Sequence, residues 1–87
     1  MKYTVIWQPS AEGDLATVWT ESKQRSVVSQ AADRIENWLR TDPEELGESR
    51  EDGERLLIES PLAVIYRLVP QDRCVFVLAV WLTTHDR

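Results

Sequence analysis

Several residue types are scarce in this 87-residue chain, and each shortage excludes a class of protein. Cys74 is the only cysteine, so no disulfide forms within the chain and folding needs no oxidising compartment. His85 is the only histidine, and no set of residues has the spacing of a metal site. The sequence also lacks a glycine-rich phosphate cradle and a Ser/His/Asp arrangement. We therefore expect neither a metal nor a cofactor.

Long hydrophobic runs are missing as well. No stretch approaches the ~20 apolar residues of a membrane span, and residues 1–7 are too short for a signal peptide. We therefore expect a cytoplasmic protein that does not contact a membrane. Hydrophobic residues make up 43% and charged residues 29%, a balance typical of soluble globular proteins, and the length predicts one domain, residues 1–87.

Positive charge is also in short supply. The formal net charge of −5 disfavours a broad electrostatic grip on nucleic acid, because phosphate binding depends on clustered Lys and Arg. The acids concentrate in residues 42–54, where Arg50 is the only cation. From Arg55 onward acidic and basic residues nearly balance, which leaves room for a local cationic patch.

The first half of the chain predicts a strand and two helices. Residues 2–7 alternate like a strand, and Ser10 is a good N-cap for a helix over 10–21. A second apolar stripe at helical spacing, which ends at Asp42-Pro43, predicts the other helix. The apolar faces predict one shared core of Trp7, Leu15, Val18, Ile35, Trp38 and Leu39.

The second half predicts three strands, over residues 55–59, 62–69 and 73–82. Short turns at Ser60-Pro61 and at 70–72 separate them, and such spacings are typical of an antiparallel meander. We therefore expect an α+β fold in the order β-α-α-β-β-β. In this fold a helix hairpin packs on a small, mainly antiparallel, four-stranded sheet.

The last strand is apolar on both faces. Val75, Val77, Ala79 and Trp81 alternate with Cys74, Phe76, Leu78, Val80 and Leu82. A half-solvated antiparallel strand normally alternates apolar with polar residues, and two helices cover only one face of a sheet. Either the sheet curls and buries both faces itself, or a partner covers the second face.

The sequence resembles the RelE/ParE toxin superfamily over nearly its whole length. The opening KYTVIWQPSAEGDLATVW resembles the family's first strand, proline and acid-rich helix start. AADRIENWLRTDPEELGESR resembles its second helix, proline stop and glycine-containing loop, and ERLLIESPLAVIYRLVPQDRCVFVLAVW resembles its terminal hairpins. The resemblance implies the toxin of a type II toxin–antitoxin or plasmid-stabilisation system, which arrests growth and is held inactive in a hetero-oligomer with a cognate antitoxin. The apolar side chains Phe76, Leu78, Val80 and Trp81 are then the candidate antitoxin contacts.

The RelE branch of the family cleaves messenger RNA on the ribosome, a reaction that needs a base, an acid and cations near the phosphate. The resemblance implies Arg55 on the first meander strand and the aromatic Tyr66 on the second as site residues. Arg50, His85 and Arg87 complete the candidate catalytic set. Each also has a purely structural interpretation, such as an ion pair of Arg50 with a neighbouring acid or a solvated terminal His85.

Departures from the RelE pattern favour the other branch. Ala63 and Leu57 stand where cationic residues are expected, and Trp81-Leu82-Thr83-Thr84 replaces a basic cluster. The ParE branch inhibits DNA gyrase by protein contact and needs no nuclease residues, so we prefer gyrase over ribosome-bound mRNA as the target. The alternative is a non-toxic, degenerate member that acts as a protein-interaction module.

Overall fold

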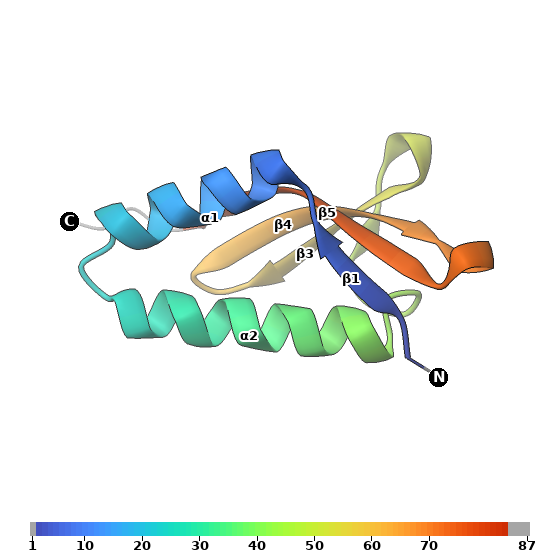
Figure 1. The fold of residues 1–87 in the computed structure, drawn as a ribbon, viewed down its shortest axis with the longest axis horizontal. Coiled ribbons are helices and arrows are strands. Elements are labelled where there is room, and N and C mark those ends of the chain that lie inside the picture. The colour runs from blue at the N-terminus through green and yellow to red at the C-terminus, as the bar shows by residue number, and fades with distance from the viewer. Residues whose placement is uncertain (1, 84–87) are drawn as a thin grey trace.

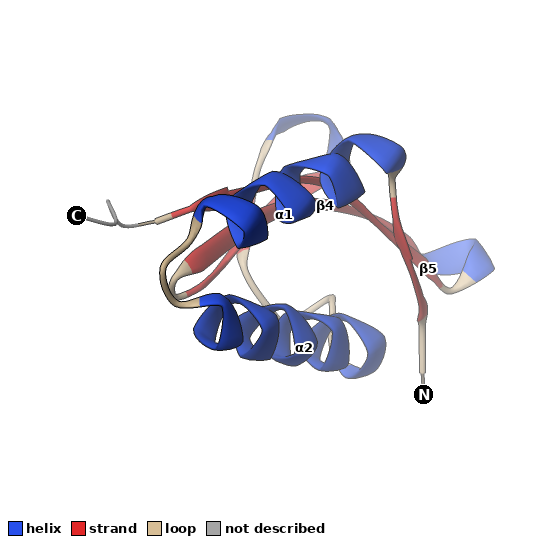
Figure 2. Cartoon of the chain, turned by 60° about the vertical axis from the view of Figure 1, so that its left-hand side comes forward, coloured by secondary structure: helices blue, strands red, loops and turns tan. Residues whose placement is uncertain are grey.

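A computed structural model describes residues 2–83 and shows two helices on one five-stranded sheet. The elements are β1 (Thr4–Trp7), α1 (Pro9–Glu21), α2 (Arg25–Thr41), β2 (Glu48–Ser49), η1 (Glu51–Gly53), β3 (Glu54–Glu59), β4 (Leu62–Val69), η2 (Pro70–Asp72) and β5 (Cys74–Leu82). The two helices run antiparallel on the same side of the sheet (Figures 1 and 2). The predicted α+β class is confirmed, and the six predicted elements follow in the expected order with one added strand, β2. Neither described helix is long and apolar enough to cross a membrane.

The sheet has one more strand than expected. Its order is β1-β5-β4-β3-β2, with β1 parallel to β5 and the other pairs antiparallel. The extra strand, β2, has only two residues, Glu48 and Ser49, which pair with Leu56 and Arg55 of β3. It forms because residues 42–54, which we call the acidic loop, fold back on β3. Gly47 and Gly53, on either side of β2, adopt positive φ angles.

Helix α1 begins one residue earlier than predicted and closes the free edge of β5. Pro9 occupies the first turn, where its missing N–H costs nothing, and the N-cap is Gln8, so Ser10 as N-cap was wrong. Ser10 Oγ instead donates to the carbonyl oxygen of Leu78 at 3.1 Å, and the Val80 N–H donates to the Asp14 carboxylate at 3.2 Å. These bonds satisfy backbone groups of β5 beyond the end of β1.

The inner face of the sheet forms the core with the helices. Leu62, Val64 and Tyr66 of β4 and Ile35 and Leu39 of α2 are fully buried there. The other predicted core residues, Trp7, Leu15 and Val18, are partly buried and pack against this cluster. Trp38 is the exception: it is 46% exposed, so its predicted place in the core was wrong.

A β-bulge in β5 redistributes the side chains between the two faces. The register of β4 against β5 passes from Ile65–Ala79 to Tyr66–Val77, which leaves Leu78 as an extra residue. Side chains beyond the bulge therefore change faces. Val80 joins Val77 on the inner face and is only 4% exposed, so strict alternation assigned it to the wrong side.

Candidate functional site

The face of the sheet opposite the helices is the main candidate surface, and we call it the outer face. Its members follow from the strand register, because side chains directly opposite on paired strands share a face. They include Ile6, Leu56, Ile58, Ala63, Ile65, Phe76, Ala79 and Trp81, together with Arg67 and its register partner Glu54. No element within residues 2–83 packs over this face as the helices pack over the other, so the sheet does not bury both faces itself.

Three of the six exposed large apolar side chains of the described residues lie on the outer face. Ile58 is 59% exposed, Trp81 41% and Ile6 39%. Single exposed apolar residues are ordinary, but several on one continuous surface mark an interaction site. Of the predicted antitoxin contacts, Trp81 and Phe76 therefore belong to this surface.

The other two predicted antitoxin contacts behave differently from each other. Leu78, the bulge residue, is half-buried and lines a shallow depression of about 290 Å³ with Gln8, Arg67, Val69 and Phe76. A partner side chain has access to Leu78 there. Val80 is buried on the inner face, and a partner on the outer face does not reach it.

Arg67 gives the outer face a cation that the sequence argument overlooked. It lies opposite Phe76 in the register and forms an ion pair with Glu54 at 3.0 Å. Its side chain remains 46% exposed, so a partner can still contact it. The hairpin register of β3, β4 and β5 is the signal that places Arg67 among apolar residues.

Arg55 and Tyr66, two of the predicted catalytic residues, come together as register partners on β3 and β4. The Arg55 Nε donates to the Leu46 carbonyl oxygen at 2.9 Å and a terminal nitrogen donates to that of Gly47 at 3.2 Å. The Tyr66 hydroxyl lies 2.8 Å from the carbonyl oxygens of both Pro43 and Leu46, and it donates to one at a time. Together they anchor the acidic loop to the sheet.

Burial raises the pKa of Tyr66, and the hydrogen bond and charge of Arg55 lower it by less than burial raises it. Tyr66 therefore stays protonated near neutral pH. Its side chain is fully buried, and its hydroxyl is already committed to the loop. In this conformation Arg55 and Tyr66 have a structural role, because they hold the acidic loop against the sheet.

The other predicted catalytic residues are not found beside Arg55 and Tyr66. The side chain of Arg50 is exposed at the start of η1 and forms no ion pair with its acidic neighbours in the part of the chain that the structure describes. His85 and Arg87 lie outside the described residues. Leu57 is a core residue, and Ala63 is 1% exposed between Ile58 and Trp81 in the register.

Among residues 2–83, no group of His, Cys, Asp or Glu side chains is arranged to hold a metal ion. The candidate site is thus a mainly apolar sheet face that carries the Arg67–Glu54 ion pair.

Solved structures of RelE and ParE toxins, alone or with their antitoxins, have a fold similar to this helix hairpin on a mixed sheet. The RelBE2 toxin–antitoxin complex from Mycobacterium tuberculosis matches with a TM-score of 0.75 and 19% identity, over 94% of this chain and 92% of that one. The chromosomal ParDE system from P. aeruginosa matches with a TM-score of 0.72 and 14% identity, over 95% and 98%. The isolated E. coli RelE toxin matches with a TM-score of 0.63 and 15% identity, over 98% and 88%.

No protein-family model matches the sequence, and no curated protein matches it. At these identities the likeness is one of fold: the chain has the RelE/ParE toxin fold.

Proposed function

We propose that this chain is the toxin of a bacterial type II toxin–antitoxin pair, and that its antitoxin covers the outer face of the sheet. The observation that carries the proposal is the exposed apolar surface around Ile58 and Trp81 on a RelE/ParE toxin fold. A chain of 87 residues buries only ~60–65% of its unfolded surface, so a partner on this face adds stability that the chain lacks alone.

The antitoxin segment has a chemistry that the surface dictates. A specific complex buries roughly 1,200–2,000 Å² in total, and apolar side chains seated near Phe76, Leu78 and Trp81 anchor it. The acidic loop at 42–54 favours a basic stretch on the antitoxin, and association that slows as salt rises.

For the cellular target we favour DNA gyrase, inhibited by protein contact, over mRNA cleavage on the ribosome. RNA cleavage needs cations that face a developing phosphorane charge. Leu57 and Ala63 offer no charge, and the Arg55 guanidinium is bonded to loop carbonyl oxygens. The hydroxyl of Tyr66 is buried and hydrogen-bonded to loop carbonyl oxygens. These four observations support a toxin that works without nuclease chemistry.

The toxin proposal is tested by inducing the gene alone in a bacterium and measuring the growth of the culture. We expect growth arrest that co-expression of the adjacent gene's product relieves. Unimpaired growth with soluble, folded protein would instead support the alternative, a non-toxic interaction module.

Two assays distinguish gyrase from ribosome-bound mRNA as the target: one uses the purified chain and the other uses RNA from the arrested cells. We expect inhibition of DNA supercoiling by purified gyrase and weak or absent cleavage in primer extension on translated messages. Strong codon-positioned cuts would overturn the gyrase preference. The residues to substitute would then be Arg50 and Arg67 first, followed by Arg55, Tyr66, His85 and Arg87.

A further inference from the structure

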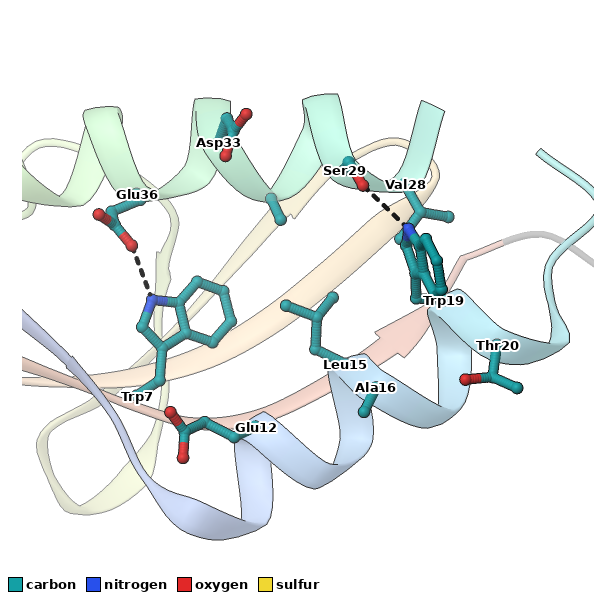
Figure 3. Close-up of a pocket in the computed structure, with 11 residues that line it drawn as sticks. Trp7, Glu12, Leu15, Ala16, Trp19, Thr20, Val28, Ser29, Asp33 and Glu36 are labelled. Atoms are coloured by element: carbon teal, nitrogen blue, oxygen red, sulfur yellow. Dashed lines mark hydrogen bonds between the residues drawn. The ribbon is translucent and has the colours of Figure 1, made fainter. Parts of the chain in front are cut away.

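Helices α1 and α2 do not pack tightly against each other along their full length. A groove of about 510 Å³ lies between them, on the opposite side of the sheet from the outer face. Trp7, Leu15, Val28 and Ala32 form its apolar floor, and Trp19 closes one end (Figure 3). We call this the interhelical groove.

The two tryptophans of the groove are held in place by hydrogen bonds to α2, one from Trp7 of β1 and one from Trp19 of α1. The Trp7 indole Nε1 donates to the Glu36 carboxylate at 3.0 Å, and the Trp19 Nε1 donates to Ser29 Oγ at 3.0 Å (Figure 3). The Arg25 guanidinium lies 4.9 Å from the centroid of the Trp19 ring. Trp19 is nevertheless 42% exposed. The groove is therefore preformed, and binding does not have to order its aromatic walls.

The charged side chains that line the groove are all acidic: Glu12, Asp33 and Glu36. Arg40 neutralises Glu36 through an ion pair at 2.7 Å. Glu12 and Asp33 have no ion pair within residues 2–83, so the rim presents two uncompensated carboxylates. A ligand that complements the groove is apolar along its middle and basic at its edges.

The length of the groove selects the shape of the ligand. Ser29 and Glu36, which hold its two ends, are seven positions apart on α2, a span of about 10 Å. Docked helices use anchors at i, i+4 and i+7, which cover this same span. We propose that the interhelical groove binds an amphipathic helix of a partner protein, with two or three aliphatic anchors on the floor and Lys or Arg beside Glu12 and Asp33.

A second copy of this chain is a poor occupant, because its net charge of −5 meets an acidic rim. The inference is independent of the proposed function, since the groove and the outer face lie on opposite sides of the sheet. Failure of either leaves the other standing.

The four indole N–H groups provide a built-in test. We would titrate the ¹⁵N-labelled full chain with a synthetic 15-residue helical peptide that carries Leu at three anchor positions and Lys at the flanks. The indole signals of Trp7 and Trp19 should shift, while those of Trp38 and Trp81, which lie outside the groove, stay fixed. A peptide with every Lys replaced by Glu should bind at least tenfold more weakly.

Charge reversal on the chain locates the binding. Asp33→Lys and Glu12→Lys should each weaken the Lys peptide at least fivefold, and the matched reversal Glu45→Lys, on an exposed residue outside the groove, should leave its affinity within twofold. Shifts confined to Trp81, equal losses in all three variants, or equal binding of the Glu peptide would each overturn the proposal. So would sedimentation showing that the free chain self-associates and that Asp33→Lys abolishes this self-association.

Discussion

The two faces of one sheet have opposite surroundings although their sequences are equally apolar. On the inner face, Val64 and Tyr66 are fully buried beneath α1 and α2, and on the outer face Ile58 and Trp81 are left about half in solvent. Two helices cover a single face, so the apolar residues of the other have no partner within the described chain. An apolar strand sequence therefore does not say which face the chain itself buries, because the position of the covering helices decides that.

The faces also differ in what a substitution should do. On the inner face, side chains are close-packed, so a deletion leaves a cavity and lowers the free energy of unfolding. On the outer face, a substitution alters a surface that water already contacts, so its effect should appear in partner binding.

The largest expected effect lies in the inner core. Ile35→Ala or Leu39→Ala should lower the free energy of unfolding by ~2–5 kcal/mol, because each side chain is fully buried against the sheet. Urea denaturation would measure this loss. Trp38→Ala, on the same helix but 46% exposed, is the control and should cost less than either. A loss under half a kcal/mol at both core sites would contradict the assigned packing.

The next effect concerns the loop that the inner-face residues anchor. Gly47 has a φ of +71°, and a Cβ there would overlap the Leu56 backbone oxygen and crowd the Tyr66 hydroxyl. Gly47→Ala should therefore cost roughly 2–4 kcal/mol, from backbone strain and overlap together. Gly53 has nearly the same φ, +75°, but open space around it, so Gly53→Ala should cost only about 1–2 kcal/mol. Equal losses in thermal melts would refute the close approach.

Tyr66→Phe should cost about 1–3 kcal/mol, because the buried carbonyl oxygen of Pro43 loses its donor, while that of Leu46 keeps its hydrogen bond from Arg55. The effect also depends on pH. The raised pKa of Tyr66 means that the folded chain retains this proton above pH 10, where the unfolded chain loses it. The free energy of unfolding therefore has its full value below about pH 10 and decreases as the pH rises above it. The Phe variant should lose less stability between pH 9 and 11; an unchanged slope would argue against burial of the hydroxyl.

The smallest effect on folding is expected on the outer face. Ile58→Arg should change the free energy of unfolding by less than about 0.5 kcal/mol, since the side chain is 59% exposed. Val27→Arg, on an exposed position of α2, is the matched control with the same added charge. A large loss for Ile58→Arg in urea melts would show that the outer face is part of the core after all.

Sequence reasoning located most of the fold because the signals were local. Pro9 and Asp42-Pro43 bound the helices, and the turn at Ser60-Pro61 separates β3 from β4 within a residue of the prediction. The two-residue strand β2 has no periodicity to detect, since it arises from the loop's return to β3.

The wrong assignments of Val80 and Trp38 also have physical causes. Alternation has a period of two, and it cannot reveal an inserted residue when both faces are apolar; the bulge at Leu78 therefore passed unnoticed and Val80 was assigned to the wrong face. Trp38 precedes the buried Leu39 by one position, about 100° around the helix, so it lies at the flank of the apolar stripe, where 46% of it is exposed.

For the candidate site, hairpin register was enough to bring Arg55 and Tyr66 together. It did not show that both would bond to the loop between α2 and β2, because that contact depends on how residues 43–47 fold back. The interhelical groove was equally invisible, since its width depends on how the two helices cross.

The central claim is that the outer face binds a neutralising partner, and thermal melting with the product of the adjacent gene tests it most directly. With that product at 100 times its Kd, the melting temperature of the native chain and of Val27→Arg should rise by roughly 10–20 °C. Ile58→Arg should show no comparable rise, because its charge lies on the apolar docking surface. A melting temperature of the native chain that ignores the product, or an equal rise in all three proteins, would contradict the account.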